Sequence, residues 1–296
     1  MVTARNHLRD MTVQSIRRRA GTNAPASVAD ETKSAGQSLA RPAVPAVVHT
    51  ISIVSYLNER ASEAATLAEI SSDLGISKSH THSILKTLSH FDWVLFDARR
   101  KTYQLQAGLL SYITSLLNYP ILEHVRTTLS EFVKQADMPC VLTQPLPDRS
   151  FVVVDTFRSR QFMQIFYPIG YRFPGTASAQ MRALYAWQDR KTIDEWLQDW
   201  RAVRHTEHTV IDKEGVLKEI LDTRKRGYAR SLSEFAPGMT GLARPIFDRD
   251  GKVSYILSVS YLGSDDEVDE RKLAELMRAA TAEIHRLTLA RVPPDY

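Results

Sequence analysis

The chain has 296 residues, of which 43% are hydrophobic and 24% are charged, and its length predicts two globular domains. Its apolar runs fall short of the roughly 18 residues needed to cross a bilayer, which excludes a membrane-spanning protein. The lone cysteine, Cys140, excludes an internal disulfide framework, a CxxC redox pair and a cysteine-based zinc finger. The first residues lack a signal-peptide apolar stretch, so we expect a cytoplasmic protein.

The net charge of +4 originates in the first 45 residues, which carry seven Lys or Arg and three Asp or Glu. Bases and acids balance in 46–118 and again in 119–296, so whole-chain basicity is weak evidence for a nucleic-acid partner. Residues 1–45 are rich in Ala, Ser, Thr, Arg and Pro and show no apolar period, which predicts a disordered basic arm. Arg17–Arg19 could contact phosphates or simply be solvated.

Residues 46–106 have the pattern of a helix-turn-helix. Apolar residues at helical spacing from Val47 predict a first helix that ends near Arg60. Thr66 and Glu69 form a capping-box pattern that starts a short second helix, and Gly75 stops it. Ser77 can cap a longer third helix. A short helix, a Gly-containing turn and a longer helix are typical of a helix-turn-helix.

A basic hairpin and a linker follow the third helix. The runs 93–96 and 102–105 are β-prone, and the segment between them ends in Arg99, Arg100 and Lys101. Three helices and a basic hairpin predict a winged helix. Residues 107–117 predict a linker helix, and Asn118 to Pro120 predict a break after it.

The remaining residues, 120–296, alternate between helical and β patterns. We expect strands near 139–146, 150–157, 161–167, 228–232, 241–248 and 252–262, and helices near 121–136, 176–188, 191–200, 212–226 and 265–290. Strands, helices, strands and a final helix predict an α+β domain with a largely antiparallel sheet.

Three stretches in this order resemble the IclR family of bacterial transcriptional regulators: TLAEISSDLGISKSHTHSILKTL, FPGTASAQMRALYAW and RKRGYARSLSEFAPGMTGLARPIFDRDGKVSYILSVS. The resemblance implies an N-terminal winged helix-turn-helix that binds DNA, a linker helix and a C-terminal GAF-like effector domain, assembled as a homodimer or a dimer of dimers. The expected divisions are a basic arm (1–45), a DNA-binding domain (46–106), a linker helix (107–119) and an effector-binding domain (120–296).

The chain departs from the family pattern at positions that bear on specificity. His80 and Ser83 replace a common Thr and Arg on the recognition helix, so we expect a different operator. Near the effector cleft, Met181-Arg182 replaces Gly-Lys, and Ser231 and Leu232 replace acidic residues. Asp92 and Gln106 stand where the family has glycines around the wing.

The predicted DNA-binding residues lie on the third helix and the wing: Lys78, Ser79, His80, Thr81, His82, Lys86, Arg99, Arg100 and Lys101. Ser, Thr and Lys suit phosphates, while His and Lys can also contact purine acceptors in the major groove. The alternative is a solvated helix face on a module that binds protein.

The resemblance implies an effector cleft formed by Met163, Ala179, Gln180, Gly241, Ser258 and Ser260. Helix N-terminal amides and serine hydroxyls suit a small carboxylate. Alternatively, Ser258 and Ser260 are small polar residues tolerated beneath the terminal helix.

We predict no enzymatic activity, cofactor or metal. His205 and His208 have the wrong spacing for a helical ligand pair, no nucleophile elbow is present, and Cys140 lies among apolar residues that favour a buried thiol. The favoured function is a regulator that binds double-stranded DNA and controls catabolic genes in response to a small organic or aromatic acid. The alternative is a metabolite-sensing protein or enzyme that uses its winged helix for protein contacts.

Overall fold

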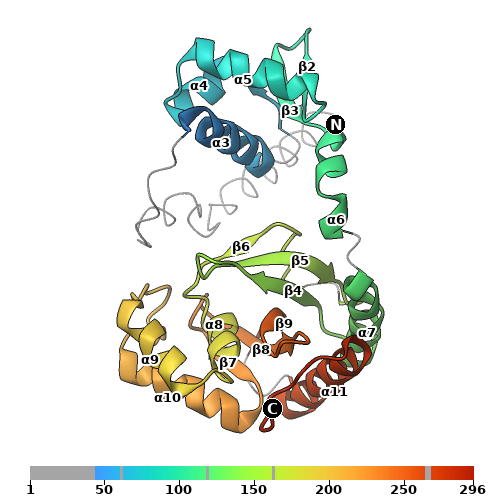
Figure 1. Ribbon diagram of the computed structural model, residues 1–296, viewed down its shortest axis with the longest axis vertical. Helices are drawn as coiled ribbons and strands as arrows, with labels where there is room; N and C mark the ends of the chain where they lie inside the picture. Colours follow the sequence, from blue (N-terminus) through green and yellow to red (C-terminus); the bar gives the residue numbers. More distant parts are fainter. Residues whose placement is uncertain (1–43, 61–62, 118–119, 162–163, 264–267) are drawn as a thin grey trace, which may run out of the picture. The chain divides into compact units, whose positions relative to one another are not determined.

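The computed structural model describes residues 44–60, 63–117, 120–161, 164–263 and 268–296 (Figure 1). Nearly all of the predicted basic arm, and Met163 of the predicted effector cleft, lie outside these residues. The described chain is α+β, with a small winged helix in its N-terminal part and a larger sheet domain after residue 120.

The winged helix contains helices α3 (Pro45–Glu59), α4 (Leu67–Leu74) and α5 (Lys78–His90) and strands β1 (Ala65–Thr66), β2 (Val94–Asp97) and β3 (Thr102–Leu105). The predicted capping box is confirmed, because the Glu69 N–H donates to Thr66 Oγ1 and the Thr66 N–H donates to Glu69 Oε2. Gly75 ends α4 with a φ of +64°, and the Ser77 hydroxyl caps α5. The two-residue strand β1, which pairs with β3, was not predicted.

Residues 107–117 are not the single helix that was predicted. Ala107–Tyr112 form a 3₁₀ helix, and Thr114–Leu117 form the short α-helix α6. A side chain at Gly108 would place its Cβ 2.3 Å from the Asp92 carbonyl oxygen, and Tyr112 packs edge-on against Trp93. Residues 107–112 therefore adopt a tight helix because they pack against the start of the hairpin.

In the described residues, the larger domain has a six-stranded antiparallel sheet in the order β6-β5-β4-β9-β8-β7. The strands are β4 (Cys140–Pro145), β5 (Phe151–Phe157), β6 (Arg172–Phe173), β7 (Ala229–Leu232), β8 (Met239–Phe247) and β9 (Val253–Leu262). The predicted strand at 161–167 is wrong, since residues 164–167 form no strand and Arg172–Phe173 pair with β5 instead. Tyr167 packs against Tyr171 and Phe173, so these three rings form an aromatic cluster beside the sheet.

Helices cover both faces of this sheet (Figure 1). One core lies beneath α7 (Pro120–Ala136) and α11 (Glu270–Thr288), and the other lies beneath α8 (Ser178–Tyr185), α9 (Arg190–Asp199) and α10 (Lys213–Arg226). Alternate residues of β9 divide between the cores, with Leu257 and Val259 facing the first and Ile256 the second. The face that carries Ile256 also carries the polar residues Ser258 and Ser260.

Two buried basic residues lie at the end of the domain near Phe247. Arg244 is buried and donates to Thr281 Oγ1 over 3.2 Å, while its guanidinium lies 4.4 Å from the centre of the Tyr296 ring. The Phe247 N–H donates to His285 Nε2 over 3.0 Å, so the imidazole accepts this bond in its neutral form. Burial, reinforced by the nearby Arg244 charge, lowers the pKa of His285 to about 4.

This depressed pKa predicts a pH-dependent stability. Unfolding releases His285 to a pKa of about 6.5, so the unfolded state binds more protons between pH 6.5 and 4, and stability falls as the pH drops through that window. The parent should lose up to about 1.4 kcal/mol per pH unit relative to His285→Gln, which keeps an acceptor but does not titrate. Urea unfolding followed by tryptophan fluorescence between pH 4.5 and 7.5 measures the difference, and parallel curves would contradict it.

Candidate functional site

The outer side of α5 presents a set of polar side chains. Lys78, Ser79, His82 and Lys86, all predicted to bind DNA, are exposed, as is Ser83. Among the described residues neither lysine forms an ion pair. These side chains are therefore available to phosphates or base edges.

Two members of the predicted set are not freely exposed. Thr81 is 0% exposed and belongs to the interior of the winged helix, so its side chain cannot reach DNA. His80 is half-buried, with its ring edge-on against His49 of α3 at 5.1 Å. The prediction erred because α5 turns each successive residue by about 100°, and a run of five polar residues cannot share one face.

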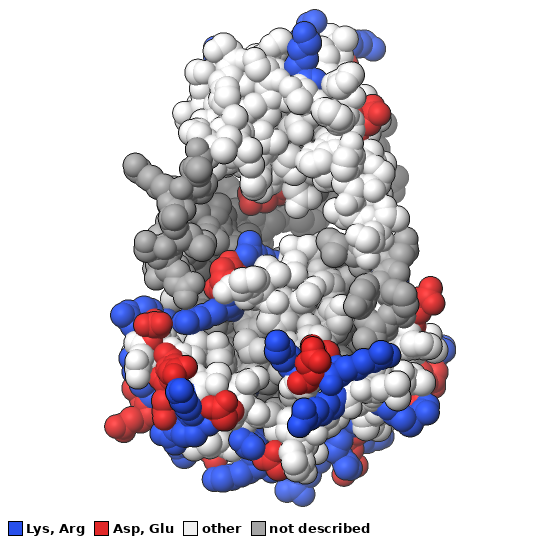
Figure 2. Space-filling model, in the orientation of Figure 1, with Lys and Arg blue, Asp and Glu red and all other residues white. Residues whose placement is uncertain are grey.

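The hairpin tip is built by one acidic side chain. Asp97 Oδ1 accepts the backbone N–H groups of Arg99 and Arg100 at 2.8 and 3.0 Å, and these bonds lower the pKa of the Asp97 carboxyl. The tip then exposes Arg99, Arg100 and Lys101, none of which forms an ion pair among the described residues. Figure 2 shows basic side chains projecting at the β2–β3 end of the winged helix.

Two acidic side chains of the winged helix, Glu69 and Asp73, form contacts away from α5 and the hairpin. Arg60 lies 4.0 Å from both Glu69 and Asp73, and Tyr56 donates to Asp73 over 2.6 Å. These acids belong to α4, not to α5 or the hairpin. Even with Asp97 in the hairpin, bases outnumber acids on α5 and the wing, which favours their contact with a polyanion.

The larger domain contains a small pocket between α8, β7, β8 and β9. It brings together five of the six predicted effector residues: Ala179, Gln180, Gly241, Ser258 and Ser260. Aromatic walls are supplied by Tyr167, Phe173 and Phe235. The enclosed space is about 20 Å³, roughly the room of one water. A ligand larger than water therefore requires movement of a wall.

Two hydroxyls of this pocket have no hydrogen-bond partner in the part of the chain that the structure describes. Ser231 and Ser258 are each 3% exposed, and among the described residues neither Oγ atom is bonded. A buried unpaired hydroxyl costs about 1–3 kcal/mol, so both groups favour an added partner. Ser231 lies opposite Gly241 in the β7–β8 register and was missing from the predicted site, although it stands where the sequence departs from the family pattern.

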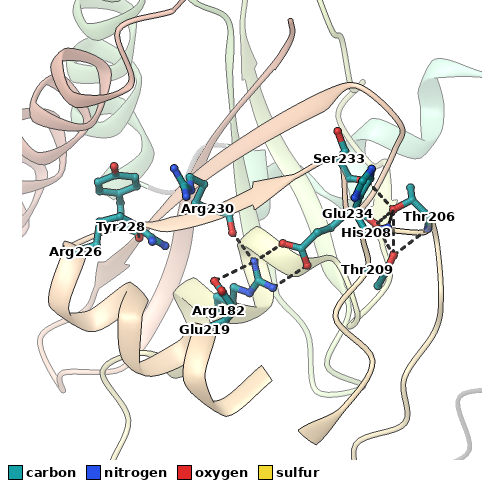
Figure 3. A network of polar contacts seen from close by, with 10 residues as sticks. All are labelled: Arg182, Thr206, His208, Thr209, Glu219, Arg226, Tyr228, Arg230, Ser233 and Glu234. Atoms are coloured by element: carbon teal, nitrogen blue, oxygen red, sulfur yellow. Dashed lines mark hydrogen bonds and ion pairs between the residues drawn. The ribbon is translucent and has the colours of Figure 1, made fainter. Parts of the chain in front are cut away.

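A buried ion pair joins two walls of the pocket (Figure 3). Arg182, 1% exposed and one turn into α8, donates to both carboxylate oxygens of Glu234 at 2.6 and 2.7 Å. Glu234 precedes Phe235, which lines the pocket. The pair therefore fixes the start of α8 relative to the segment that carries Phe235.

Threonine hydroxyls hold the same segment from its other side. Thr206 Oγ1 donates to the Ser233 carbonyl over 2.6 Å, and Thr209 Oγ1 donates to the Glu234 carbonyl over 2.7 Å (Figure 3). His205, considered in the sequence as a metal ligand, contacts Thr176 and Phe235 instead. In the described residues no cluster of three metal-ligating side chains is found.

Cys140 is buried, and burial raises the pKa of its thiol, which agrees with the expected inert side chain. None of the helices in the described part of the chain is both long and apolar enough to cross a membrane.

The winged helix with an unpaired basic face, together with a separate pocket lined by hydroxyls and aromatic rings, defines a DNA-binding protein with an effector domain. Residues 46–98 match the IclR helix-turn-helix domain, and residues 113–286 match the domain described as bacterial transcriptional regulator IclR C-terminal. The chain belongs to the IclR family of transcriptional regulators.

Curated relatives that match most of this chain are named as transcriptional regulators. The transcriptional regulator XynR of Escherichia coli (strain K12) is 26% identical over 236 residues, which cover 79% of this chain and 91% of XynR. The regulator KdgR of Dickeya chrysanthemi is 26% identical over 223 residues, 74% of this chain and 71% of KdgR. The names of these relatives describe regulators rather than enzymes, in agreement with the prediction that this chain is not an enzyme.

Solved structures share the fold. An IclR regulator from Alicyclobacillus acidocaldarius has a TM-score of 0.72 at 22% identity, covering 83% of this chain and 98% of that one. An IclR homolog from Microbacterium hydrocarbonoxydans, complexed with 4-hydroxybenzoate, has a TM-score of 0.68 at 16% identity and covers 81% and 98%.

The wing should contact the DNA backbone. Replacing Arg99, Arg100 and Lys101 together by Gln should weaken binding to specific and random duplexes alike, because phosphate contacts do not depend on sequence. The slope of log affinity against log salt should decrease by up to about three units, about 0.9 for each phosphate that is no longer neutralised. Fluorescence anisotropy with a random duplex at several salt concentrations measures the slope, and an unchanged slope would exclude wing contact.

The Arg182–Glu234 pair should be critical for the stability of the effector domain. Arg182→Met should cost about 3–5 kcal/mol, because Glu234 would remain charged and buried without its partner. Arg182→Lys should cost less, since it keeps the charge but loses the two-pronged geometry. Adding Glu234→Gln to Arg182→Met should restore part of the loss in urea unfolding. A double variant no more stable than Arg182→Met would contradict this role.

Proposed function

We propose that this chain is a transcriptional regulator in which a small organic or aromatic acid, bound in the pocket at Ser231 and Ser258, changes how the winged helix binds operator DNA. It acts on genes of catabolism and works in the cytoplasm, where its DNA partner is found. The observation that carries the proposal is the pair of buried, unpaired hydroxyls facing one pocket beside the start of α8.

Lys78, Ser79, His82 and Lys86 on α5, with Arg99, Arg100 and Lys101 on the wing, are the proposed DNA contacts. Their exposure and the absence of ion pairs among the described residues support this assignment. The α5 side chains read sequence in the major groove, whereas the wing contacts phosphates. Ser83, exposed one turn beyond Ser79, is a further candidate reader.

Ala179, Gln180, Gly241, Ser258, Ser260 and Ser231 are the proposed effector contacts. The 4-hydroxybenzoate bound by the Microbacterium homolog supports a small acid as the class of ligand. The pocket combines hydroxyls with aromatic walls, a lining typical of sites for small polar molecules with an apolar body.

The proposed functional unit is a homodimer or a dimer of dimers. Val47 and Ile51 are exposed one turn apart on α3, and the preceding Val44 is exposed as well, which supports self-association of the winged helix. Sedimentation equilibrium should give two or four times the chain mass of 33.5 kDa, and a monomer at micromolar concentration would contradict the assembly.

Replacing the Ser258 hydroxyl tests its role through two measurements, the stability of the unliganded protein and the affinity for the acid. Ser258→Ala removes a buried group that has no partner, so the free energy of unfolding without ligand should stay equal or rise. Affinity for the acid that best stabilises the parent should fall about tenfold or more, because a bound oxygen loses its donor. Ser254→Ala on the same strand is the control, since that hydroxyl donates to the Ile246 carbonyl outside the pocket.

Filling the pocket tests the same assignment without removing a polar group. A Cβ at Gly241 would lie 3.7 Å from Ala179 Cβ and 3.8 Å from Ser231 Cβ, which is ordinary contact. Gly241→Ala should therefore fold normally and bind DNA as the parent does, yet lose its response to the acid in operator titrations. An unchanged acid response in both Gly241→Ala and Ser258→Ala would place the ligand elsewhere.

A further inference from the structure

A second pocket continues the first across Tyr167. The two share Tyr167, Ser258 and Ser260, and the second extends to the ends of β4 and β5, where Arg158 and Phe166 line it. Of the described residues that line either pocket, Arg158 is the one with a formal charge. The paired pockets therefore have a cation at one end and the unpaired hydroxyl of Ser231 at the other.

Arg158 is available to an anion. It follows directly after β5, is exposed, and forms no ion pair among the described residues. Its guanidinium lies 4.1 Å from the centre of the Phe166 ring. A cation–π contact of this kind restrains the guanidinium over the ring and leaves its N–H groups available to a carboxylate.

A broad groove leads to Arg158 from solvent. The groove measures about 710 Å³, and Thr156, Phe157 and Arg158 line both it and the second pocket. Its other charged residues are Lys134, Arg160 and Asp137. Lys134 is paired with Glu131 over 3.3 Å, so Arg158 and Arg160 against Asp137 leave an excess of positive charge. Such a groove raises the local concentration of anions.

We propose that Arg158 binds the carboxylate of the effector, while Ser258 and Ser231 bind a hydroxyl or carbonyl at the ligand's other end. This assignment rests on the proposed function and narrows it. The effector is a monocarboxylic acid whose second polar group is separated from the carboxylate by an apolar or aromatic body. That body lies among Tyr167, Phe173 and Phe235.

Binding across both pockets requires Tyr167 to move. The two pockets have volumes of about 10 and 20 Å³, too small for any organic acid. Tyr167 is held by contacts with Tyr171 and Phe173 and by a 3.5 Å contact of its hydroxyl with Met239 Sδ. Phe235 lies on the segment fixed by Glu234, so the Tyr167 wall is the one that yields.

The experiment compares acids with their uncharged amides. Thermal shifts of the full chain are measured with benzoate, 4-hydroxybenzoate, pyruvate and gluconate and with the four matching primary amides. The pair with the largest acid shift is then titrated by calorimetry against the parent, Arg158→Met and Arg160→Met. Arg160→Met is the matched control, because Arg160 lines the groove but neither pocket.

Arg158→Met should weaken binding of the acid by about ten- to hundredfold, the range for removal of a charge-assisted hydrogen bond, and leave amide binding unchanged. Arg160→Met should change acid affinity less than threefold. Raising NaCl from 50 to 500 mM should weaken acid binding to the parent more than to Arg158→Met, since salt screens an exposed charge pair.

An acid-to-amide preference that survives in Arg158→Met would overturn the role of Arg158, and so would equal losses in the two arginine variants. In either case, weaker acid binding to Ser258→Ala would show that the pocket itself still holds the acid, bound through the start of α8. If no acid shifts the parent's melting temperature, the proposed effector class fails as well. Unliganded melting temperatures of the variants check that each is folded.

Discussion

The effector domain depends on the burial of β8 and β9 from both sides. All nine residues of β8 are buried, and β9 is buried through most of its length. A strand pair in this position needs helices on each face, which α7 and α11 provide on one side and α8 to α10 on the other. A polar side chain that is buried on these strands is consequently removed from water and must find a partner within the protein or in a ligand.

Most polar groups in this environment do find a protein partner. Arg244 bonds to Thr281 and stacks on Tyr296, His285 accepts from the backbone of Phe247, and Arg182 pairs with Glu234. Ser231 and Ser258 differ, because their hydroxyls face a pocket and have no partner in the described residues. Other buried polar atoms of the domain, Arg182 Nε and Thr223 Oγ1 among them, also lack a partner in the described residues, but Ser231 and Ser258 are the two of these side chains that line the pocket. Because an unpaired buried hydroxyl costs stability, two of them at one pocket are a physical reason to assign the ligand there.

Local signals in the sequence predicted the winged helix well. Thr66, Gly75 and Ser77 determine helix ends through contacts within a few residues, and such contacts can be read from spacing. The predicted 161–167 strand is wrong because Tyr167 packs with Tyr171 and Phe173 instead of pairing in the sheet, which an aromatic residue pattern does not distinguish. The exposure of α5 was predicted only in part, since a polar residue such as Thr81 can still face inward.

The effector residues came from a family resemblance, and five of the six do meet in one pocket. The remaining features could not be derived from sequence alone. Arg182 and Glu234 are 52 positions apart, and Arg158 approaches the pocket because β5 pairs with β4, which in turn pairs with β9. Such contacts follow from strand order, which residue patterns leave undetermined.

Hydrogen–deuterium exchange of the full chain, with and without the best-binding acid, tests most directly whether that acid occupies this pocket. The account predicts slower exchange in the start of α8, in β7 and in the β8–β9 pair, where the ligand would supply the missing hydrogen bonds and exclude water. Slower exchange confined to other elements, with these strands unchanged at saturating acid, would contradict it.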